Sequence, residues 1–341
     1  MRPLLLITIG DVAGVGPEIV ARALARSEIY ERCRPLVVGD AGSVGAAIAL
    51  IGTTETAINL VSDPGAALYT PGTIDVLQPI EAIGEVVPGQ LSSQAGQAAV
   101  AYVRAAAGLA RDGMADAIVT APINKAAIHA AGFAYPGHTE ILADFFAVDR
   151  YSLVLTCEGL FAFHVTTHVS LRNALDEITH RNVLATVELA SEFARARGDL
   201  EEPIAVAGLN PHAGEQGVFG SEELSEITPA IEEAVRRGIP AVGPVPADAL
   251  WPAAVKGSYR YLVFMYHDQG HAPFKALFGD AGVNITVGLP VLRTSVDHGT
   301  AFDIAGMGIA REDSLLHAIE LAVELVPAWA AVWRSIGRSS V

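Results

Sequence analysis

Short apolar runs alternate with amphipathic segments along almost the whole chain, and this alternation constrains the fold more than any other feature. The apolar runs have the length of strands and comprise residues 4–9, 36–38, 117–119, 152–156, 204–207, 261–265 and 283–287. Apolar residues at helical spacing predict helices over residues 17–26, 94–111, 179–197, 222–237 and 314–333. Strands that alternate with helices form largely parallel sheets with covered faces. The sequence therefore predicts an α/β fold.

Length and charge narrow the class of protein. A chain of 341 residues exceeds the usual size of one hydrophobic core, so we expect two α/β lobes with a cleft between them. The formal net charge of −16 argues against nucleic acid or an anionic membrane as a partner. An anionic substrate therefore needs a site that concentrates positive charge locally.

The cysteines and the N-terminus indicate the compartment. Cys33 and Cys157 are the only cysteines, too few for a disulfide framework or a thiolate zinc site. The apolar run at residues 4–9 is followed at once by Asp11, so we expect a first strand and not a signal peptide. No apolar stretch approaches the roughly 20 residues of a membrane helix. These features predict a soluble, cytoplasmic protein.

The densest group of polar side chains follows the apolar run at residues 261–265. Its ionisable members are His267, Asp268, His271 and Lys275. Gly270 and Pro273 in the same segment indicate a polar loop. Because α/β folds bind ligands outside the carboxyl ends of strands, we interpret this segment as a wall of an active site.

A glycine-rich loop, residues 10–18, joins the first strand to a helix for which Pro17 suits the first position. The context is typical of nucleotide-binding loops, but Ile19 stands where the pattern G-x-G-x-x-G requires a third glycine. A dinucleotide-binding Rossmann motif is therefore not predicted. A tight turn that lets strand and helix pack closely and a ligand-binding loop both stay open.

Two further loops carry polar side chains next to predicted strands or helices. Residues 120–125 follow a strand, and we expect Lys125 in the cleft because lysine is scarce, although it also suits a first helical turn. In residues 136–140, Thr139 can cap the helix that runs to Phe146. A helix N-terminus also binds anions through its free N–H groups.

Three of the ten histidines, His168, His212 and His267, each follow a strand-like run and precede a turn. Such strand ends can converge at one cleft. Three neutral imidazoles leave coordination positions open on zinc or a similar divalent ion, as in catalytic metal sites. For each histidine alone, a hydrogen-bonded role in core or loop is an equal alternative. His164, inside a strand, is expected to be a satisfied core residue.

Residues 282–306 are rich in polar side chains and glycines and lie just ahead of the predicted C-terminal helix. A surface loop has such a composition too. The pair Gly299 and Thr300 and the Asp-Ile-Ala-Gly sequence of residues 303–306 favour a shaped binding loop.

Taken together, these motifs closely resemble the PdxA family, the 4-hydroxythreonine-4-phosphate dehydrogenases and their paralogues, across nearly the whole chain. The matching segments are residues 10–18, 120–125, 137–140, 166–168, 210–215, 247–248, 266–270 and 284–306. The resemblance implies an isocitrate/isopropylmalate-dehydrogenase-like fold, a homodimer with active sites at the subunit interface, and NAD or NADP as oxidant. We place the nucleotide-binding lobe at residues 1–125 and 275–341, and the metal and dimerisation lobe at residues 126–274.

The resemblance also implies roles for individual residues. One divalent metal, zinc, magnesium or cobalt, would be held by His168, His212 and His267. The implied substrate-binding residues are His138, Thr139, Lys275, Asn284 and Arg293. The implied catalytic residues are Asp248, Asp268 and Lys275. Residues 298–306 resemble the adenosine-side loop of isopropylmalate dehydrogenases. The expected cofactor contacts are Gly288, Leu289, Pro290, Thr300 and Asp303.

The implied reaction oxidises a phosphorylated or otherwise anionic hydroxy acid with metal assistance, and decarboxylation follows. Lys275 or a water held by an aspartate would return a proton to carbon. Two residues depart from the family pattern: Val12 replaces a usual proline, and His271 replaces an apolar residue typical of the vitamin B6 enzymes. His271 favours paralogues that act on D-threonate or D-erythronate 4-phosphate, or on a terephthalate cis-dihydrodiol. A supporting histidine that leaves specificity unchanged is the alternative.

Two other classes of function stay open. A metal-dependent hydrolase would use the same three histidines to activate water and would need no nicotinamide. Residues 303–306 argue against it. A non-catalytic protein that binds sugar acids would also need a two-lobed cleft, but the predicted metal triad argues against this class.

Overall fold

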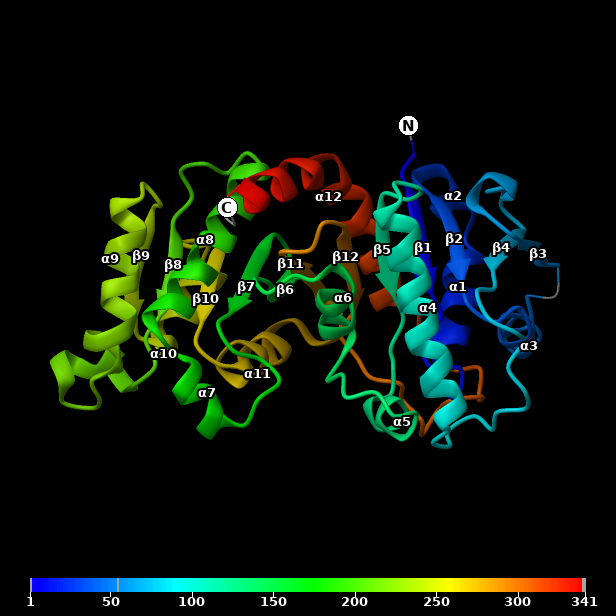
Figure 1. Ribbon diagram of the computed structural model, residues 1–341, viewed down its shortest axis with the longest axis horizontal. Helices are drawn as coiled ribbons and strands as arrows, with labels where there is room; N and C mark the ends of the chain where they lie inside the picture. The colour runs from blue at the N-terminus through cyan, green and yellow to red at the C-terminus, as the bar shows by residue number, and fades with distance from the viewer. Residues whose placement is uncertain (1, 54, 339–341) are drawn as a thin grey trace. The chain divides into compact units, whose positions relative to one another are not determined.

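The computed structural model describes residues 2–53 and 55–338, which form two compact units (Figure 1). Unit 1 comprises Met1–Val148 and Leu289–Pro327, and unit 2 comprises Asp149–Gly288 and Ala328–Val341. The units change after Val148 and Gly288, whereas we expected boundaries after residues 125 and 274. The roles that we expect for the two lobes stay predictions.

Unit 1 is built on parallel strands. In spatial order they are β3 (Ala57–Val61), β4 (Thr73–Leu77), β2 (Arg34–Val38), β1 (Leu4–Thr8), β5 (Ala117–Thr120) and β12 (Leu292–Val296). Every pairing among these strands is parallel. β1 is buried along its whole length, as expected of a central strand that is covered on both faces.

Three helices of unit 1 begin at a side chain that accepts a hydrogen bond from a free backbone N–H group. The helices of this unit are α1 (Gly16–Leu24), α2 (Ser27–Arg32), α3 (Ala41–Ile51), α4 (Ser93–Arg111), α5 (Lys125–Ala130), α6 (His138–Phe146) and the first part of α12 (Asp313–Arg338). Asp40 caps α3, Ser92 caps α4 and Asn124 caps α5. The long helix α4 lies beside β1, β2 and β5 (Figure 1).

Unit 2 mixes parallel and antiparallel pairings. Its strands, in spatial order, are β11 (Val283–Val287), β6 (Ser152–Cys157), β7 (Leu160–His164), β10 (Tyr261–Phe264), β8 (Ile204–Ala207) and β9 (Ala241–Val245). β6 runs antiparallel to β11 and β7, and the other pairings are parallel. Glu158 and Gly159, with φ of 51° and 79°, make the two-residue turn that sends β7 back along β6.

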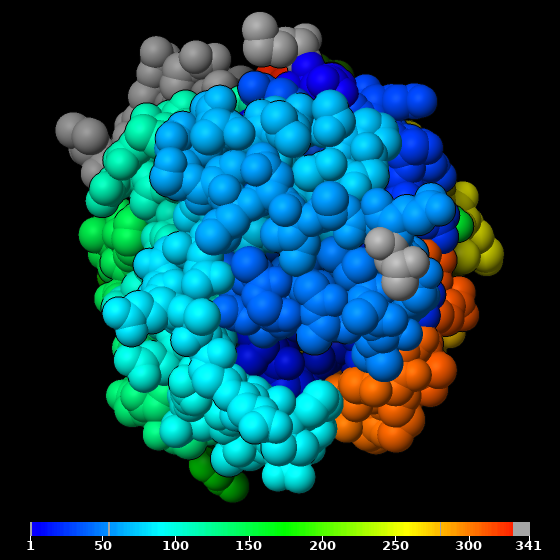
Figure 2. All heavy atoms as spheres, turned by 90° about the vertical axis from the view of Figure 1, so that its right-hand side faces the viewer, coloured from blue at the N-terminus to red at the C-terminus, as the bar shows by residue number. Residues whose placement is uncertain are grey.

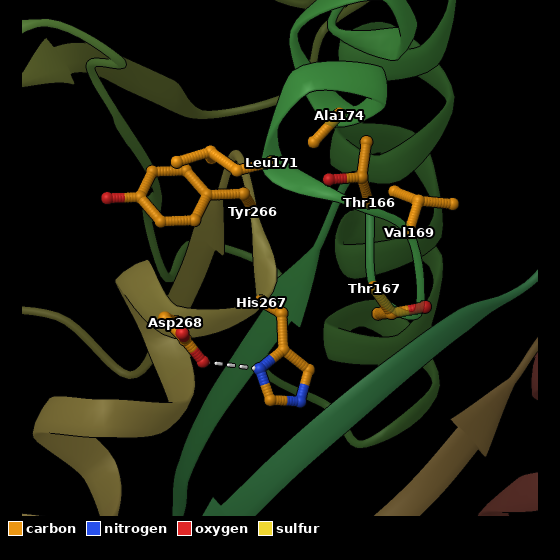
Figure 3. Close-up of a pocket in the computed structure, with 8 residues that line it drawn as sticks. All are labelled: Thr166, Thr167, Val169, Leu171, Ala174, Tyr266, His267 and Asp268. Carbon is orange, nitrogen blue, oxygen red and sulfur yellow. Dashed lines mark hydrogen bonds and ion pairs between the residues drawn. The ribbon is translucent and has the colours of Figure 1, made fainter.

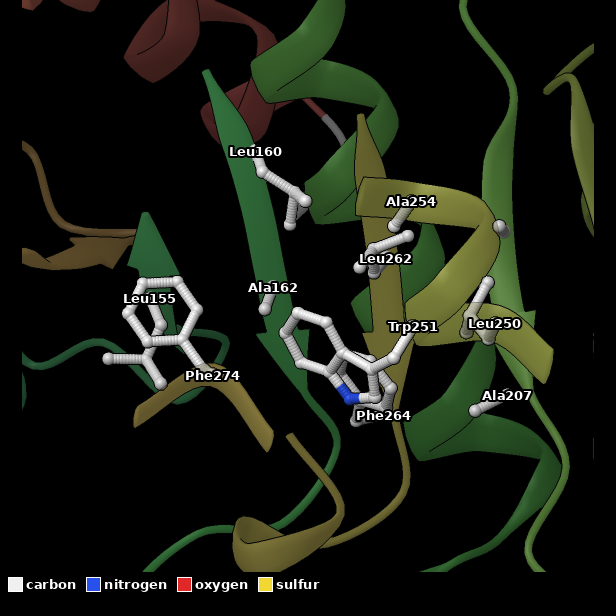
Figure 4. Packing of buried hydrophobic residues seen from close by; sticks show 11 residues of the cluster. Leu155, Leu160, Ala162, Ala207, Leu250, Trp251, Ala254, Leu262, Phe264 and Phe274 are labelled. Carbon is white, nitrogen blue, oxygen red and sulfur yellow. The ribbon is translucent and has the colours of Figure 1, made fainter. Parts of the chain in front are cut away.

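A hydrophobic cluster holds two helices of unit 2 on its strands (Figure 4). The helices of this unit are α7 (Leu171–Glu177), α8 (His180–Ala196), α9 (Thr228–Arg236), α10 (Ala247–Val255), α11 (His267–Phe278) and the end of α12. Trp251 of α10 stacks on Phe264 of β10 with ring centroids 5.0 Å apart. Phe274 of α11 meets the same indole edge-on, with centroids 6.3 Å apart. The cluster thereby fixes the position of α11.

Residues 267–278 form helix α11, where we expected a polar loop. Pro273 lies inside the helix and has no N–H to donate to the carbonyl of Gln269. That carbonyl instead accepts a hydrogen bond from Trp251 Nε1 at 3.1 Å. The loop prediction was wrong because a contact with α10 replaces the hydrogen bond that proline removes.

The predicted α/β fold with largely parallel strands is confirmed, although single elements differ. Residues 292–296, which we placed in a polar loop, form the fully buried strand β12. Strand β3 was not predicted because most of its residues are exposed or half-buried and form no apolar run. In the described part of the chain, no helix is both long and apolar enough to cross a membrane.

Candidate functional site

The candidate site residues lie in both units. Those of unit 1 are His138, Thr139, Leu289, Pro290, Arg293, Thr300 and Asp303. Those of unit 2 are His168, His212, Asp248, His267, Asp268, Lys275, Asn284 and Gly288. Each unit therefore carries its own set of candidate ligand contacts.

Arg293 is a buried cationic side chain of unit 1. Its side chain rises from β12 and is 3% exposed, and Nε and Nη2 donate to Thr120 Oγ1 at 3.2 and 2.8 Å. Burial lowers the pKa of Arg293 to about 9, and the nearby Glu140 opposes this shift. The guanidinium therefore keeps its charge near neutral pH. Its planar fork suits a phosphate or a carboxylate.

The N-terminus of α6 lies near Arg293, whose charge acts on His138. Its N-cap is Gly137 and not Thr139, which lies in the first helical turn and is 3% exposed, so the capping prediction was wrong. Burial and the charge of Arg293 hold the pKa of His138 well below its ordinary value. A hydrogen bond with the Ala121 backbone acts in the opposite direction and raises this pKa. His138 Nε2 is buried without a hydrogen-bond partner among the described residues. A bound ligand can satisfy this atom.

The candidate cofactor loop, residues 298–306, packs on the glycine-rich loop, residues 10–18. A Cβ at Gly14 would lie 2.8 Å from Thr300 Cβ and 2.9 Å from its carbonyl oxygen. Glycine is therefore required for this close approach. Close packing therefore explains why residue 14 is glycine. This agrees with the first of the two interpretations of residues 10–18, a tight turn that lets strand and helix pack closely.

A second contact fixes the far end of the candidate cofactor loop. The buried Glu18 of α1 accepts a hydrogen bond from the backbone N–H of Gly306 at 2.6 Å. Thr300 is buried and Asp303 is exposed. On the face of unit 1 in Figure 2, dark blue N-terminal residues form the floor of a hollow, and orange residues near position 300 lie at its edge.

In unit 2, His267 and Asp268 form a hydrogen-bonded pair at the start of α11 (Figure 3). The distance between His267 Nδ1 and Asp268 Oδ1 is 2.7 Å. An ionised carboxylate accepts a hydrogen bond from Nδ1–H. The lone pair on Nε2 of His267 is then available to a ligand. Both residues line a cavity of about 260 Å³, together with Thr166, Thr167, Val169, Leu171, Ala174 and Tyr266.

Two of the three predicted metal ligands lie close together. The ring centroids of His168 and His267 are 6.0 Å apart, whereas two imidazoles on one tetrahedral ion would be roughly 5 Å apart. These two residues fit a shared ion after a small movement. However, no three His, Cys, Asp or Glu side chains within residues 2–53 and 55–338 are grouped to hold a metal. The structure therefore does not bring His212 into a complete metal site.

His212 lies on a strained backbone segment. His212, Ala213, Glu215 and Gln216 have φ between 42° and 55°, a left-handed conformation that residues other than glycine rarely adopt. Each such residue costs roughly 1–3 kcal/mol, and strain of this kind gathers at ligand sites and moving segments. The position of His212 thus depends on whatever holds this turn.

Glu223 holds the residues just before this turn, and the sequence motifs did not include it. This buried carboxylate accepts hydrogen bonds from the backbone N–H groups of Leu209 and Asn210, at 2.8 and 2.6 Å. Its second oxygen accepts from Asn210 Nδ2 at 2.8 Å. No sequence signal marked it, because an acidic residue at the start of the predicted helix at 222–237 looks like an ordinary surface residue.

His164 and His271 form a buried pair beneath His267. Their Nε2 and Nδ1 atoms are 3.1 Å apart, and the side chains are 2% and 7% exposed. Burial lowers the pKa of His164 to about 4 and that of His271 to about 2, so both rings are neutral near pH 7. The expectation that His164 is a satisfied core residue is confirmed.

The remaining candidates of unit 2 are placed as follows. Lys275 is exposed on α11, one turn after His271, and its charge contributes to the lowered pKa of His271. Asn284 is half-buried on β11. Asp248 is exposed in the first turn of α10. In unit 1, Lys125 is exposed at the first position of α5, which matches the alternative of an ordinary first-turn residue.

Known proteins are similar to this chain in sequence and fold. The family model for the pyridoxal phosphate biosynthetic protein PdxA matches residues 31–322. D-Threonate 4-phosphate dehydrogenase of Bordetella bronchiseptica is 53% identical over 334 residues, which cover 98% of this chain and 95% of the relative. The enzyme of that name from Cupriavidus necator is 46% identical over 325 residues, which cover 95% and 97%. A crystal structure of 4-hydroxythreonine-4-phosphate dehydrogenase from Klebsiella pneumoniae matches with a TM-score of 0.86 at 42% identity, over 96% of this chain and 98% of that one.

These relatives are dehydrogenases, and they support an oxidoreductase as the class of enzyme for this chain. The chain belongs to the PdxA family. The resemblance drawn from its motifs is thereby confirmed.

Proposed function

We propose that the protein oxidises a phosphorylated hydroxy acid of the D-threonate 4-phosphate class with NAD or NADP, and that the product loses CO2. The buried, charged Arg293 beside the N-terminus of α6 carries this proposal, because together they suit a phosphate group. The names of the relatives from B. bronchiseptica and C. necator support the choice of substrate. His271, atypical of the vitamin B6 enzymes, favours the same choice.

Arg293, His138 and Thr139 are proposed to bind the phosphate. The hydrogen bonds from Arg293 to Thr120 orient the guanidinium before the substrate arrives, which lowers the entropic cost of binding. Lys275 and Asn284 are proposed to bind the rest of the substrate.

His168, His212 and His267 are proposed to hold one divalent cation, zinc, magnesium or cobalt. Two observations support His168 and His267 as ligands. His267 donates a hydrogen bond to Asp268, and the ring centroids of His168 and His267 are 6.0 Å apart. His212 would complete the set only if its left-handed turn moves. A bound cation would supply Lewis-acid stabilisation of charge on the substrate oxygen.

The chain's own groups would handle the protons. Asp268 keeps the proton of His267 on Nδ1. Asp248 would orient a water or the substrate, and Lys275 would return a proton to carbon after CO2 leaves. Gly288, Leu289, Pro290, Thr300 and Asp303 are the proposed cofactor contacts. The active form is proposed to be a homodimer with active sites at the subunit interface.

The substrate is tested by incubating the purified protein with NAD or NADP and a divalent cation. D-Threonate 4-phosphate, D-erythronate 4-phosphate, 4-hydroxythreonine 4-phosphate and the terephthalate dihydrodiol are compared by formation of reduced nicotinamide and by release of CO2. We expect the highest kcat/KM with D-threonate 4-phosphate and no turnover after chelation of the cation. Turnover that persists in chelated protein would contradict the metal-dependent reaction.

4-Hydroxythreonine 4-phosphate is the second candidate substrate. The name of the K. pneumoniae structure, with its TM-score of 0.86, favours it. A higher kcat/KM with this compound than with D-threonate 4-phosphate would establish the second candidate and reject the first.

The phosphate contact is tested by Arg293→Lys. Lysine keeps the charge but not the planar fork, so we expect KM for the phosphorylated substrate to rise at least about tenfold, since a hydrogen bond to a charged group contributes roughly 1.5–3 kcal/mol. Arg311→Lys is the matched control, because the side chain of Arg311 is 83% exposed. An unchanged KM for Arg293→Lys would remove Arg293 from the phosphate site.

A further inference from the structure

Three histidines of unit 2 form one connected histidine array: His164 at the end of β7, and His267 and His271 one turn apart on α11. The rings of His267 and His271 stack, with centroids 3.7 Å apart and planes inclined by 9°. The rings of His271 and His164 have centroids 4.6 Å apart. The array thus leads from the buried core to His267, which is 38% exposed.

The hydrogen bonds of the array specify which nitrogen carries each proton. His164 Nδ1 lies 3.2 Å from the carbonyl oxygen of Leu153, which can only accept, so Nδ1 is the donor. Nε2 of the neutral His164 is then an acceptor, and His271 Nδ1 must donate to it. The same His271 N–H also faces the carbonyl oxygen of His267 at 3.2 Å. Both buried rings therefore have a single tautomer and a single orientation.

Gly270 makes this arrangement possible. A Cβ at this position would lie 2.1 Å from His164 Nε2 and 3.0 Å from two ring carbons. The backbone of α11 can approach His164 only because residue 270 has no side chain. The approach brings His271 within hydrogen-bond distance of His164.

His267 needs such support, because Asp268 alone holds it weakly. The side chain of Asp268 is 79% exposed, so water competes for its hydrogen bond with His267 Nδ1. The stacked ring of His271 restricts rotation of the His267 ring from the other side. A leucine at position 271 would offer neither a flat face nor a donor to His164.

We propose that His271 is a positioning residue for His267, and that His164 holds His271 in place. The stacked ring fixes the plane of His267, keeps its proton on Nδ1 toward Asp268, and presents Nε2 to a divalent cation. Only the cation rests on the proposed function; the effect on the His267 ring belongs to the protein alone.

The first test is ¹⁵N NMR of the metal-free protein with labelled histidine, in mildly alkaline buffer. In the wild-type protein we expect His164, His267 and His271 each to have a protonated Nδ1 and an unprotonated Nε2. In His271→Leu, the Nε2 resonance of His267 should shift toward the average of two exchanging tautomers. His129→Leu is the matched control, since His129 is exposed on α5 of unit 1.

The second test is titration with Co²⁺, followed by its visible absorption. We expect His271→Leu to weaken Co²⁺ binding about 10- to 100-fold, as loss of a group that orients a ligand does. His271→Phe keeps a flat face and should lose less than tenfold. His129→Leu should bind as the wild type does, and thermal unfolding establishes that each variant is folded.

The two tests separate this inference from the proposed function. If His271→Leu leaves both the His267 tautomer and the Co²⁺ affinity within twofold of wild type, the positioning role is wrong. If the wild type binds no Co²⁺ and oxidises no substrate, the proposed function is wrong, and the NMR result still decides whether His271 positions His267. A shift of the His267 resonance in His271→Leu alone supports the inference in either case.

Discussion

His164 and His271 show what burial does to a single residue. Their rings are neutral because each charged form would lose its hydration, and the two neutral rings share a hydrogen bond with one fixed tautomer each. Arg293 is the opposite case. Burial lowers its pKa to about 9, yet it stays charged near pH 7. The interior of the protein thus holds neutral imidazoles in unit 2 and a positive charge in unit 1.

The buried imidazoles predict a pH dependence of stability. The pKa of His164 is about 4 in the folded protein against 6.5 for an ordinary histidine, so unfolding takes up a proton between these values. Stability is fully present above about pH 6.5 and falls as the pH drops toward 4. We expect His164→Gln to reduce the slope of the free energy of unfolding against pH in this window by roughly 1 kcal/mol per pH unit.

Chemical denaturation at several pH values between these limits measures the slope. His271→Leu should reduce it in the same direction, and His129→Gln, a change at an exposed position, should leave it as in the wild type. Equal slopes in His164→Gln and the wild type would show that His164 titrates normally.

At the scale of elements, the contact between α4 and α5 depends on one glycine. A Cβ at Gly96 would lie 2.2 Å from the carbonyl oxygen of Ala127 in α5. Gly108, in the same helix, would place its Cβ 4.0 Å from Phe145 and meet no backbone. Two glycines of one helix therefore differ in what they tolerate.

This difference predicts opposite effects of the same substitution. Gly96→Ala should lower the free energy of unfolding by about 1–3 kcal/mol, because α5 must move. Gly108→Ala should raise it by about 0.5–1 kcal/mol, because alanine favours the helix. Denaturant titration of both variants measures the effects, and a stable Gly96→Ala protein would mean that α4 and α5 are further apart than described.

Elements with local signals could be predicted from sequence, and elements held by distant contacts could not. Residues 179–197 repeat apolar side chains at helical spacing, and α8 begins and ends within one residue of these limits. Helix α11 was missed because the hydrogen bond that allows Pro273 comes from Trp251 in another helix. The residues around Pro273 in the sequence do not indicate that a side chain of another helix supplies this hydrogen bond.

The candidate site divides in the same way. Strand ends and the family motifs predicted His168 and His267, which the structure places with ring centroids 6.0 Å apart. His212 was predicted by the same argument, but its position depends on a left-handed turn that directly follows residues held by Glu223. Such a turn cannot be inferred from residue types that rarely form it.

At the scale of the whole molecule, exposed apolar side chains follow the His212 turn. Val218, Phe219 and Leu224 are 72%, 48% and 55% exposed. Large apolar side chains gathered on a surface favour an interface between proteins. This segment is therefore a candidate for the proposed dimer contact.

The dimer is tested by charging this surface. We expect the wild type to have twice the monomer mass in light scattering, and Val218→Glu with Phe219→Glu to reduce the mass to that of a monomer. Leu60→Glu is the control, because Leu60 is 61% exposed on β3 of unit 1. A charged variant that stays dimeric would place the interface elsewhere.

The absent side chain at position 270 also restricts how such a chain can diverge. Because a Cβ there would meet the His164 ring at 2.1 Å, a lineage cannot gain a side chain at 270 while it keeps the imidazole. Exchange of His164 for a smaller residue must come first, and His271 loses one of its two acceptors at that step. This clash sets the order of the two substitutions. We expect that no reconstructed ancestor of this protein carries alanine at 270 together with histidine at 164.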